Sequence, residues 1–259
     1  NMTNTNRISY LDMARGIGML LVVMGHIQYL SGNLLQYVTA FHMPLFFFIS
    51  GILILEKKEE EKPYKELIKK KLYSIMLPYA VFSILSFLIE STRILIKGLD
   101  EWNVVLRQLF QSCCLQGVST LWFLPALFMS ELLFIAIRKK NSYNGTLLLV
   151  ALIVTGAGVL NTYEQDFAYI HAGSRVYRLF HDVCSMVIRN LFCVGFLCAG
   201  YFFHKVFLKR KLSGPIQVLC TLTFAVISYV SVSVAGFADL RYMRFRSWGL
   251  YLIIAISGS

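Results

Sequence analysis

The sequence predicts an all-α protein, a polytopic bundle of membrane-spanning helices. Three observations lead to this fold class. Apolar side chains make up 57% of the 259 residues and charged side chains only 15%, a balance typical of membrane proteins rather than of soluble domains. Many of the apolar residues lie in long runs, and roughly 20 residues are needed to cross a bilayer. Short clusters of Lys and Arg separate these runs, as expected for membrane-protein loops.

Eight apolar runs are predicted as spans. The first covers residues 9–30, and the second covers only 40–55 unless the preceding LQYVTAFHMP lengthens it. Five further runs are long enough by themselves: 73–96, 120–137, 145–161, 183–204 and 215–236. The eighth begins at residue 247 and stops after a dozen residues. We therefore expect one integral-membrane domain over 1–259 that continues beyond residue 259.

The Lys-rich loops predict a cytoplasmic N-terminus. With this orientation the inside loops are 56–72, 138–144 and 205–214, and each carries a cluster of positive charge, as the positive-inside rule requires. The opposite orientation would place all three clusters outside. The net charge of +11 therefore belongs to loops that orient helices and does not indicate a nucleic-acid partner.

Two features are predicted for the outer side of the membrane. Segment 98–119 is mildly amphipathic and either lies along the outer interface or re-enters the membrane. Arginines gather near the ends of the last three spans: Arg175, Arg178, Arg189, Arg241, Arg244 and Arg246. Because Arg forms forked contacts with carboxylates and phosphates, these residues either bind an anionic group or pair with Asp166, Asp182, Asp239 and lipid phosphates.

The cysteines predict no metal site. Their spacing does not match a metal-ligand motif, so we interpret most of them as ordinary buried thiols. The six are Cys113, Cys114, Cys184, Cys193, Cys198 and Cys220.

Arg15 and His26 are ionisable residues on one hydrophobic helix, where burying such side chains in the membrane is energetically unfavourable. They are eleven residues apart, and eleven steps along a helix rotate a side chain by about 1,100°, only about 20° beyond three full turns. The two side chains therefore point from the same face of the helix. Along the helix axis they are about 16 Å apart. A shared polar face inside a membrane usually marks a pathway or a site. The alternative is that Arg15 snorkels to the inner interface and His26 lies at the outer one. Neighbouring residues can pair with Arg15 or admit another helix or a ligand: Asp12, Gly16, Gly18 and Gly25.

The second span supplies another histidine on the same side. Pro44 stands where a first helical turn tolerates it, which places His42 at the outer mouth of the helix, near His26. A neutral imidazole can accept a proton near pH 7. His42 otherwise caps the helix or makes an interfacial hydrogen bond.

Four motifs lie between residues 8 and 137, in this order: DMARGIGMLLVVMGHI, FHMPLFFFISGIL, KKKLYSIMLPY and LWFLPALFMSELLF. Together they resemble the membrane-bound acyltransferase-3 superfamily, in particular its branch related to fucose 4-O-acetylase. The resemblance implies about ten membrane helices in the bacterial cytoplasmic membrane. It also implies transfer of an acyl group, commonly acetyl, from cytoplasmic acyl-CoA to a hydroxyl of a sugar or cell-envelope glycan.

The resemblance also implies roles for individual residues. His26 would be the catalytic base and Arg15 would engage the acyl donor. His42 and Ser50 match the second motif, and we place His42 with the catalytic residues and Ser50 with the CoA-binding ones. Trp122 matches the fourth motif as a substrate-binding residue, although a Trp in a span is otherwise an interfacial belt residue.

The third motif departs from the family pattern, because relatives often carry Arg before PY. Here the stretch offers only lysines, which attract phosphates as point charges but cannot make the forked contact. We assign the CoA phosphates to Lys70 and Lys71. Glu131, an acid within the fourth span, is assigned to the substrate site; it could instead pair with Arg15, orient a His, or pair with another buried cation.

The spacing of the first helix fits this chemistry. The charged end of CoA would meet cytoplasmic cations while its arm reaches between helices toward His26, where an acceptor from the outer side would lose its proton. Two other functions stay open. The polar face could be the pathway of a transporter for a small polar solute or glycan, or the chain could be the membrane-sensing half of a larger protein.

Overall fold

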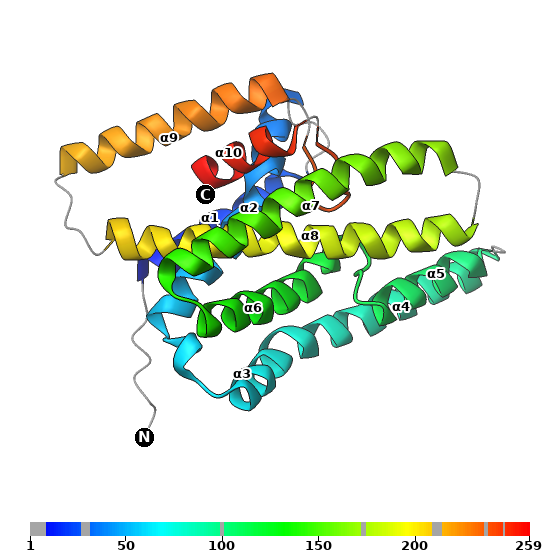
Figure 1. The fold of residues 1–259 in the computed structure, drawn as a ribbon. Coiled ribbons are helices and arrows are strands. Elements are labelled where there is room, and N and C mark those ends of the chain that lie inside the picture. The colour runs from blue at the N-terminus through cyan, green and yellow to red at the C-terminus, as the bar shows by residue number, and fades with distance from the viewer. Residues whose placement is uncertain are drawn as a thin grey trace. The chain divides into compact units, whose positions relative to one another are not determined.

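The computed structural model describes residues 9–26, 32–98, 101–171, 175–208, 214–235, 238–245 and 247–259, and there it is built from helices (Figure 1). This confirms the predicted all-α class. The long helices, in chain order, are α1 (Ser9–Met24), α2 (Gly32–Glu56), α3 (Tyr64–Lys71), α4 (Leu77–Lys97), α5 (Trp102–Cys113), α6 (Phe123–Lys140), α7 (Tyr143–His171), α8 (Arg175–Phe203), α9 (Gly214–Ala235) and α10 (Trp248–Gly258). Short 3-10 and π-helical turns lie between them: η1 (Glu59–Glu61), η2 (Leu72–Met76), η3 (Ser119–Trp122) and η4 (His204–Leu208).

Within the described ranges, six helical stretches are long and apolar enough to cross a membrane: Leu35–Glu56, Tyr64–Lys97, Ser119–Lys140, Tyr143–Gln165, Phe180–Val206 and Gly214–Val234. They correspond to the second to seventh predicted runs, so a multi-pass protein is confirmed. The first run is shorter than predicted, since α1 has 16 residues and residues 27–31 lie outside the described ranges. The eighth run is the short apolar helix α10.

Helix α2 corrects one prediction. It starts at Gly32, and Pro44 lies inside it rather than in its first turn. His42 is therefore not at the mouth of the helix but ten residues along it. Membrane helices tolerate an internal Pro because neighbouring groups can satisfy the freed backbone carbonyl. The helix consequently includes LQYVTAFHMP, which lengthens the second span.

The chain divides into two compact units. The terminal unit comprises the described residues of Asn1–Lys57 and Gly195–Ser259, and the central unit comprises those of Lys58–Val194. In the terminal unit α1 packs on α2, and α10 packs on both α2 and α9 (Figure 1). One part of its core is a cluster of Leu11, Leu45, Phe48, Ile49 and Ile52.

Within the terminal unit, α2 and the end of α8 meet at two glycines. A Cβ atom on Gly51 would overlap the Leu197 carbonyl oxygen, and one on Gly200 would overlap the Phe48 carbonyl oxygen. Backbones approach this closely only where side chains are absent, a common way for membrane helices to pack. The Gly of the motif FFFISG therefore has a packing role.

Gly51→Ala is expected to lower the free energy of unfolding by about 1–3 kcal/mol or more, the usual cost of overpacking. The obstacle is backbone, which cannot move aside as a flexible side chain can. Thermal unfolding in detergent measures the loss. Gly156→Ala in α7 is the matched control, because a Cβ there meets nothing within 4 Å. Equal stability of the two variants would contradict this account of the crossing.

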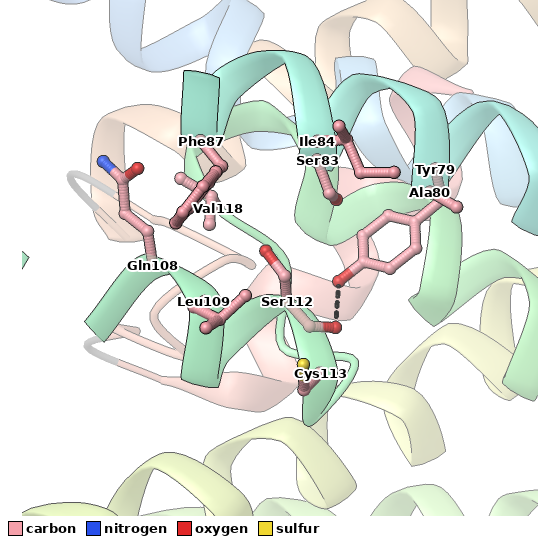
Figure 2. Close-up of a pocket in the computed structure, with 10 residues that line it drawn as sticks. All are labelled: Tyr79, Ala80, Ser83, Ile84, Phe87, Gln108, Leu109, Ser112, Cys113 and Val118. Carbon is pink, nitrogen blue, oxygen red and sulfur yellow. Dashed lines mark hydrogen bonds between the residues drawn. The ribbon is translucent and has the colours of Figure 1, made fainter. Parts of the chain in front are cut away.

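In the central unit, α5 lies along α4 (Figure 1). The Tyr79 hydroxyl of α4 donates a hydrogen bond of 2.8 Å to the Ser112 carbonyl near the end of α5 (Figure 2). Since α5 begins soon after α4 ends and returns to Tyr79, the two helices form an antiparallel hairpin. Of the two placements predicted for segment 98–119, this favours the re-entrant one.

Candidate functional site

His26 and His42 both lie in the terminal unit. His26 is exposed in the turn that follows α1, whereas His42 is buried within α2. The two rings, and the carboxylate of Asp239 with His42, are close enough for their charges to interact. His42 therefore comes within electrostatic range of His26 from the interior of a helix rather than from its mouth.

Hydrogen bonds set the tautomer of both rings. His26 Nδ1 lies 2.7 Å from the Val22 carbonyl oxygen, and His42 Nδ1 lies 2.8 Å from that of Val38. A carbonyl only accepts, so Nδ1 carries the proton in each neutral ring and Nε2 keeps its lone pair. Each imidazole thus presents Nε2 as a proton acceptor, the form that a general base requires.

The end of α1 changes the geometry predicted for Arg15 and His26. The helix ends at Met24, and the His26 N–H bonds the Val23 carbonyl, three residues back, at 3.0 Å. This tighter turn means that the regular spacing assumed across all eleven residues fails at the last two. Arg15 pairs with Asp12 at 3.8 Å, as predicted, and its side chain is 43% exposed.

Of the three glycines predicted to admit a helix or a ligand, two have α2 beside them. A Cβ on Gly25, in the turn after α1, would lie 3.9 Å from Thr39 Cγ2 of α2. A Cβ on Gly18 would lie 2.9 Å from the Phe46 ring of α2, whereas one on Gly16 meets nothing within 4 Å. Gly18 therefore admits α2. Ser50, also on α2, is buried beside the Gly51 crossing.

The central unit holds Lys71 in a buried ion network. Its Nζ lies 2.7 Å from Glu59 Oε2 and 2.8 Å from Glu131 Oε2, and all three residues are at most 6% exposed. Lys70 also reaches Glu59, at 2.8 Å, but its side chain is 44% exposed. Of the alternatives open for Glu131, the structure therefore favours pairing with another buried cation, Lys71.

This network keeps Glu59 ionised. Burial by itself opposes the charge, but the nearby Lys71 and Lys70 outweigh burial and hold the pKa of the Glu59 carboxyl below its ordinary value. Lys71 therefore faces two carboxylates, and its charge is balanced within the unit. Lys70 is the more accessible of the two lysines assigned to the CoA phosphates.

Trp122 is buried in the central unit, at the start of α6. The Arg189 guanidinium of α8 lies over its ring, 4.8 Å from the centroid, and Phe123 meets it edge-on. Among the other arginines predicted for the outer side, Arg241 and Arg244 both lie over the Tyr242 ring. Arg246, and the side chains of Arg175 and Arg178, fall outside what the structure describes.

A mostly apolar cavity of about 250 Å³ lies between α4 and α5 (Figure 2). Its lining includes Tyr79, Phe87, Leu109 and Val118, none of which was predicted as a site residue. Among the described residues, no group of three His, Cys, Asp or Glu side chains is arranged to hold a metal ion.

Three partners were missed from the sequence. Asp239 approaches His42 from a short turn near the C-terminus, Glu59 binds Lys71, and Glu56 pairs with buried His204. Of these three, only Glu59 lies close in sequence to its partner, in the charged run EKKEEEK. The other two pairs join residues more than 100 positions apart.

The comparisons with known proteins bear on the whole chain. A family model described as an acyltransferase domain, of the acyltransferase-3 type, matches residues 8–258. The match includes all four motifs and extends well beyond residue 137, where the resemblance in the sequence ended. The chain has no significant match among curated proteins or among solved structures.

Proposed function

The chain belongs to the acyltransferase-3 family and is a membrane acyltransferase, and we propose that it transfers an acyl group, commonly acetyl, from acyl-CoA to a hydroxyl of a sugar or cell-envelope glycan. The more specific likeness to fucose 4-O-acetylase rests on the motifs. We further propose the bacterial cytoplasmic membrane as its location, with the N-terminus inside, because the Lys-rich loops then obey the positive-inside rule.

The observation that carries the proposal is the exposed ring of His26, held as the tautomer with a basic Nε2 and near His42. In the reaction, Nε2 accepts the proton of the acceptor hydroxyl as its oxygen attacks the thioester carbonyl carbon. The carbon–sulfur bond then breaks, and the departing thiolate takes the proton from the imidazolium. The products are the acyl ester and CoA, and His26 returns to its neutral form.

The neighbouring residues support this chemistry. His42 and Asp239 interact electrostatically with each other, so Asp239 favours a transient positive charge on this pair of rings. Half-exposed Arg15, at the N-terminal half of α1, is available to a phosphate or carbonyl of the donor. Lys70 is the better candidate of the two lysines for CoA phosphates, since Lys71 already binds two carboxylates. We propose Trp122 for the substrate site and Ser50 for the CoA site, as the resemblance implies, whereas Glu131 is taken up by the buried network of Lys71.

The test is a transfer assay on the purified protein in nanodiscs. With acetyl-CoA and a panel of monosaccharides and glycans, we expect release of free CoA thiol and an acetylated product detected by mass spectrometry. Protein without acceptor should release thiol far more slowly. Failure to bind acetyl-CoA would overturn the proposal, and uptake of a sugar into proteoliposomes without CoA would favour a transporter.

A further inference from the structure

One side of α3, in the central unit, is apolar and exposed. Tyr64, Ile68 and Leu72, the last being the first residue of η2, follow one another at intervals of four and are 43%, 39% and 44% exposed. Residues four apart lie on the same side of a helix, so these three form a stripe, which we call the α3 stripe. Another side of the helix is anchored in the unit, because Leu67 is fully buried and Lys71 holds two carboxylates.

Two lysines border the α3 stripe. At about 100° per residue, Lys65 and Lys69 both lie within about 60° of Leu72 and about 160° from buried Leu67. Both lysines are exposed, and neither makes an ion pair or a hydrogen bond with the described part of the chain. The stripe therefore has positive charge along one border that the central unit leaves unbalanced.

The length of the helix places this end in the headgroup layer. α3 continues through η2 into α4 (Figure 1), and Tyr64–Lys97 is one apolar stretch of 34 residues. At 1.5 Å per residue the stretch is about 51 Å long, whereas a bilayer is about 40–45 Å thick including its headgroups and only about 30 Å without them. α3 carries four lysines and one glutamate among its eight residues, so it is the end that we expect outside the hydrocarbon core.

We propose that α3 is an interfacial helix that binds anionic phospholipid, with the α3 stripe in the lipid and Lys65 and Lys69 on the headgroup phosphates. Helices with lysines beside an apolar face lie in the membrane interface in this way. Lysine suits the border of such a stripe, since its stem can lie along apolar surface while its charge stays in the headgroup layer. This inference does not depend on the proposed acyltransferase function.

The charge of the two lysines predicts which lipid binds. Each lysine near an anionic membrane surface strengthens binding by about 5-fold, so the pair contributes about 25-fold. A phosphatidylcholine headgroup has a phosphate but no net charge, whereas phosphatidylglycerol has a net negative charge. The wild type should therefore bind phosphatidylglycerol at least about 10-fold more tightly than phosphatidylcholine.

Native mass spectrometry of the purified protein in a neutral detergent measures both affinities, with the dioleoyl form of each lipid as the probe. The double variant Lys65→Gln/Lys69→Gln should bind phosphatidylglycerol about 25-fold more weakly and phosphatidylcholine as the wild type does. Lys97→Gln/Arg107→Gln is the matched control, because it removes two exposed cations of the same unit outside α3, and it should bind both lipids as the wild type does. Equal affinities for the two lipids in the wild type, or equal losses in the two double variants, would overturn the proposal.

Acetyl-CoA is the other source of phosphate that these lysines could bind. Added to the complex with phosphatidylglycerol, it should leave the lipid in place. Displacement of the lipid by acetyl-CoA in the wild type but not in Lys65→Gln/Lys69→Gln would assign the two lysines to CoA and overturn the proposal. No transfer activity is needed for this measurement, so its failure is distinct from a failure of the proposed function.

The position of the α3 stripe is tested by tryptophan quenching in nanodiscs whose lipids carry bromine on their acyl chains. Ile68→Trp puts a new ring on the stripe, and Glu66→Trp puts one about 160° around the same helix, also at an exposed position. The fluorescence added by Ile68→Trp should be quenched at least about 2-fold more strongly than that added by Glu66→Trp. The Tm of each variant checks that it is folded. Equal quenching would show that the stripe is not in the lipid and would overturn the proposal.

Discussion

Replacing His26 with alanine is expected to slow acyl transfer at least about 100-fold, the lower end of what a general base contributes. The ring is exposed and bonds only the carbonyl of its own preceding turn among the contacts described for it. Its removal should therefore leave the fold intact, and the Tm should stay close to that of the wild type. The measurement is the initial rate of CoA thiol release with acceptor present.

Two controls accompany this variant. His181→Gln alters another histidine, which pairs with Glu164 in the central unit and has no proposed role, so it should keep most of the activity. Added imidazole should partly restore transfer in His26→Ala, because the His26 ring is exposed and the missing group is a base. Wild-type rates in His26→Ala would remove His26 from the mechanism without touching the family assignment.

Replacing Lys71 with methionine is expected to lower the free energy of unfolding by about 3–5 kcal/mol, the usual cost of removing one partner from a buried ion pair. Methionine has a similar length, so lost packing contributes little. The cost arises because Glu59 and Glu131 would face each other in a buried site without a cation. Thermal unfolding of the protein in detergent reports the change.

Lys70→Met is the control for this prediction. Lys70 shares Glu59, but its side chain is 44% exposed, and exposed pairs contribute at most about 1 kcal/mol. Glu131→Gln added to Lys71→Met should recover part of the lost stability, since it removes one stranded charge. Equal losses from the two Lys variants would show that Lys71 is not the structural centre of the network.

The course of each span was largely predictable because it depends on local sequence. A run of about 20 apolar residues forms a helix in a membrane, where every backbone group must be bonded within its own segment. Asp12 and Arg15 were paired correctly for the same reason, since three residues along a helix bring side chains together. Helix ends were less predictable. The sequence predicts a helix start at Pro44, but Pro44 lies inside α2. It also predicts a helix that continues through His26, but α1 ends at Met24 and a turn follows.

Partners from distant parts of the chain could not be predicted. The sequence by itself determined an all-α membrane protein, the motif with Arg15 and His26, and through its motifs the acyltransferase-3 family. Only the tertiary structure decided that Lys71 binds Glu131, 60 residues away, and that Arg189 stacks on Trp122. The physical reason is that the length of an apolar run and the spacing of residues on a helix depend only on residues near in sequence. The strength of an ion pair depends instead on the distance between the charges in space, which the folded chain sets.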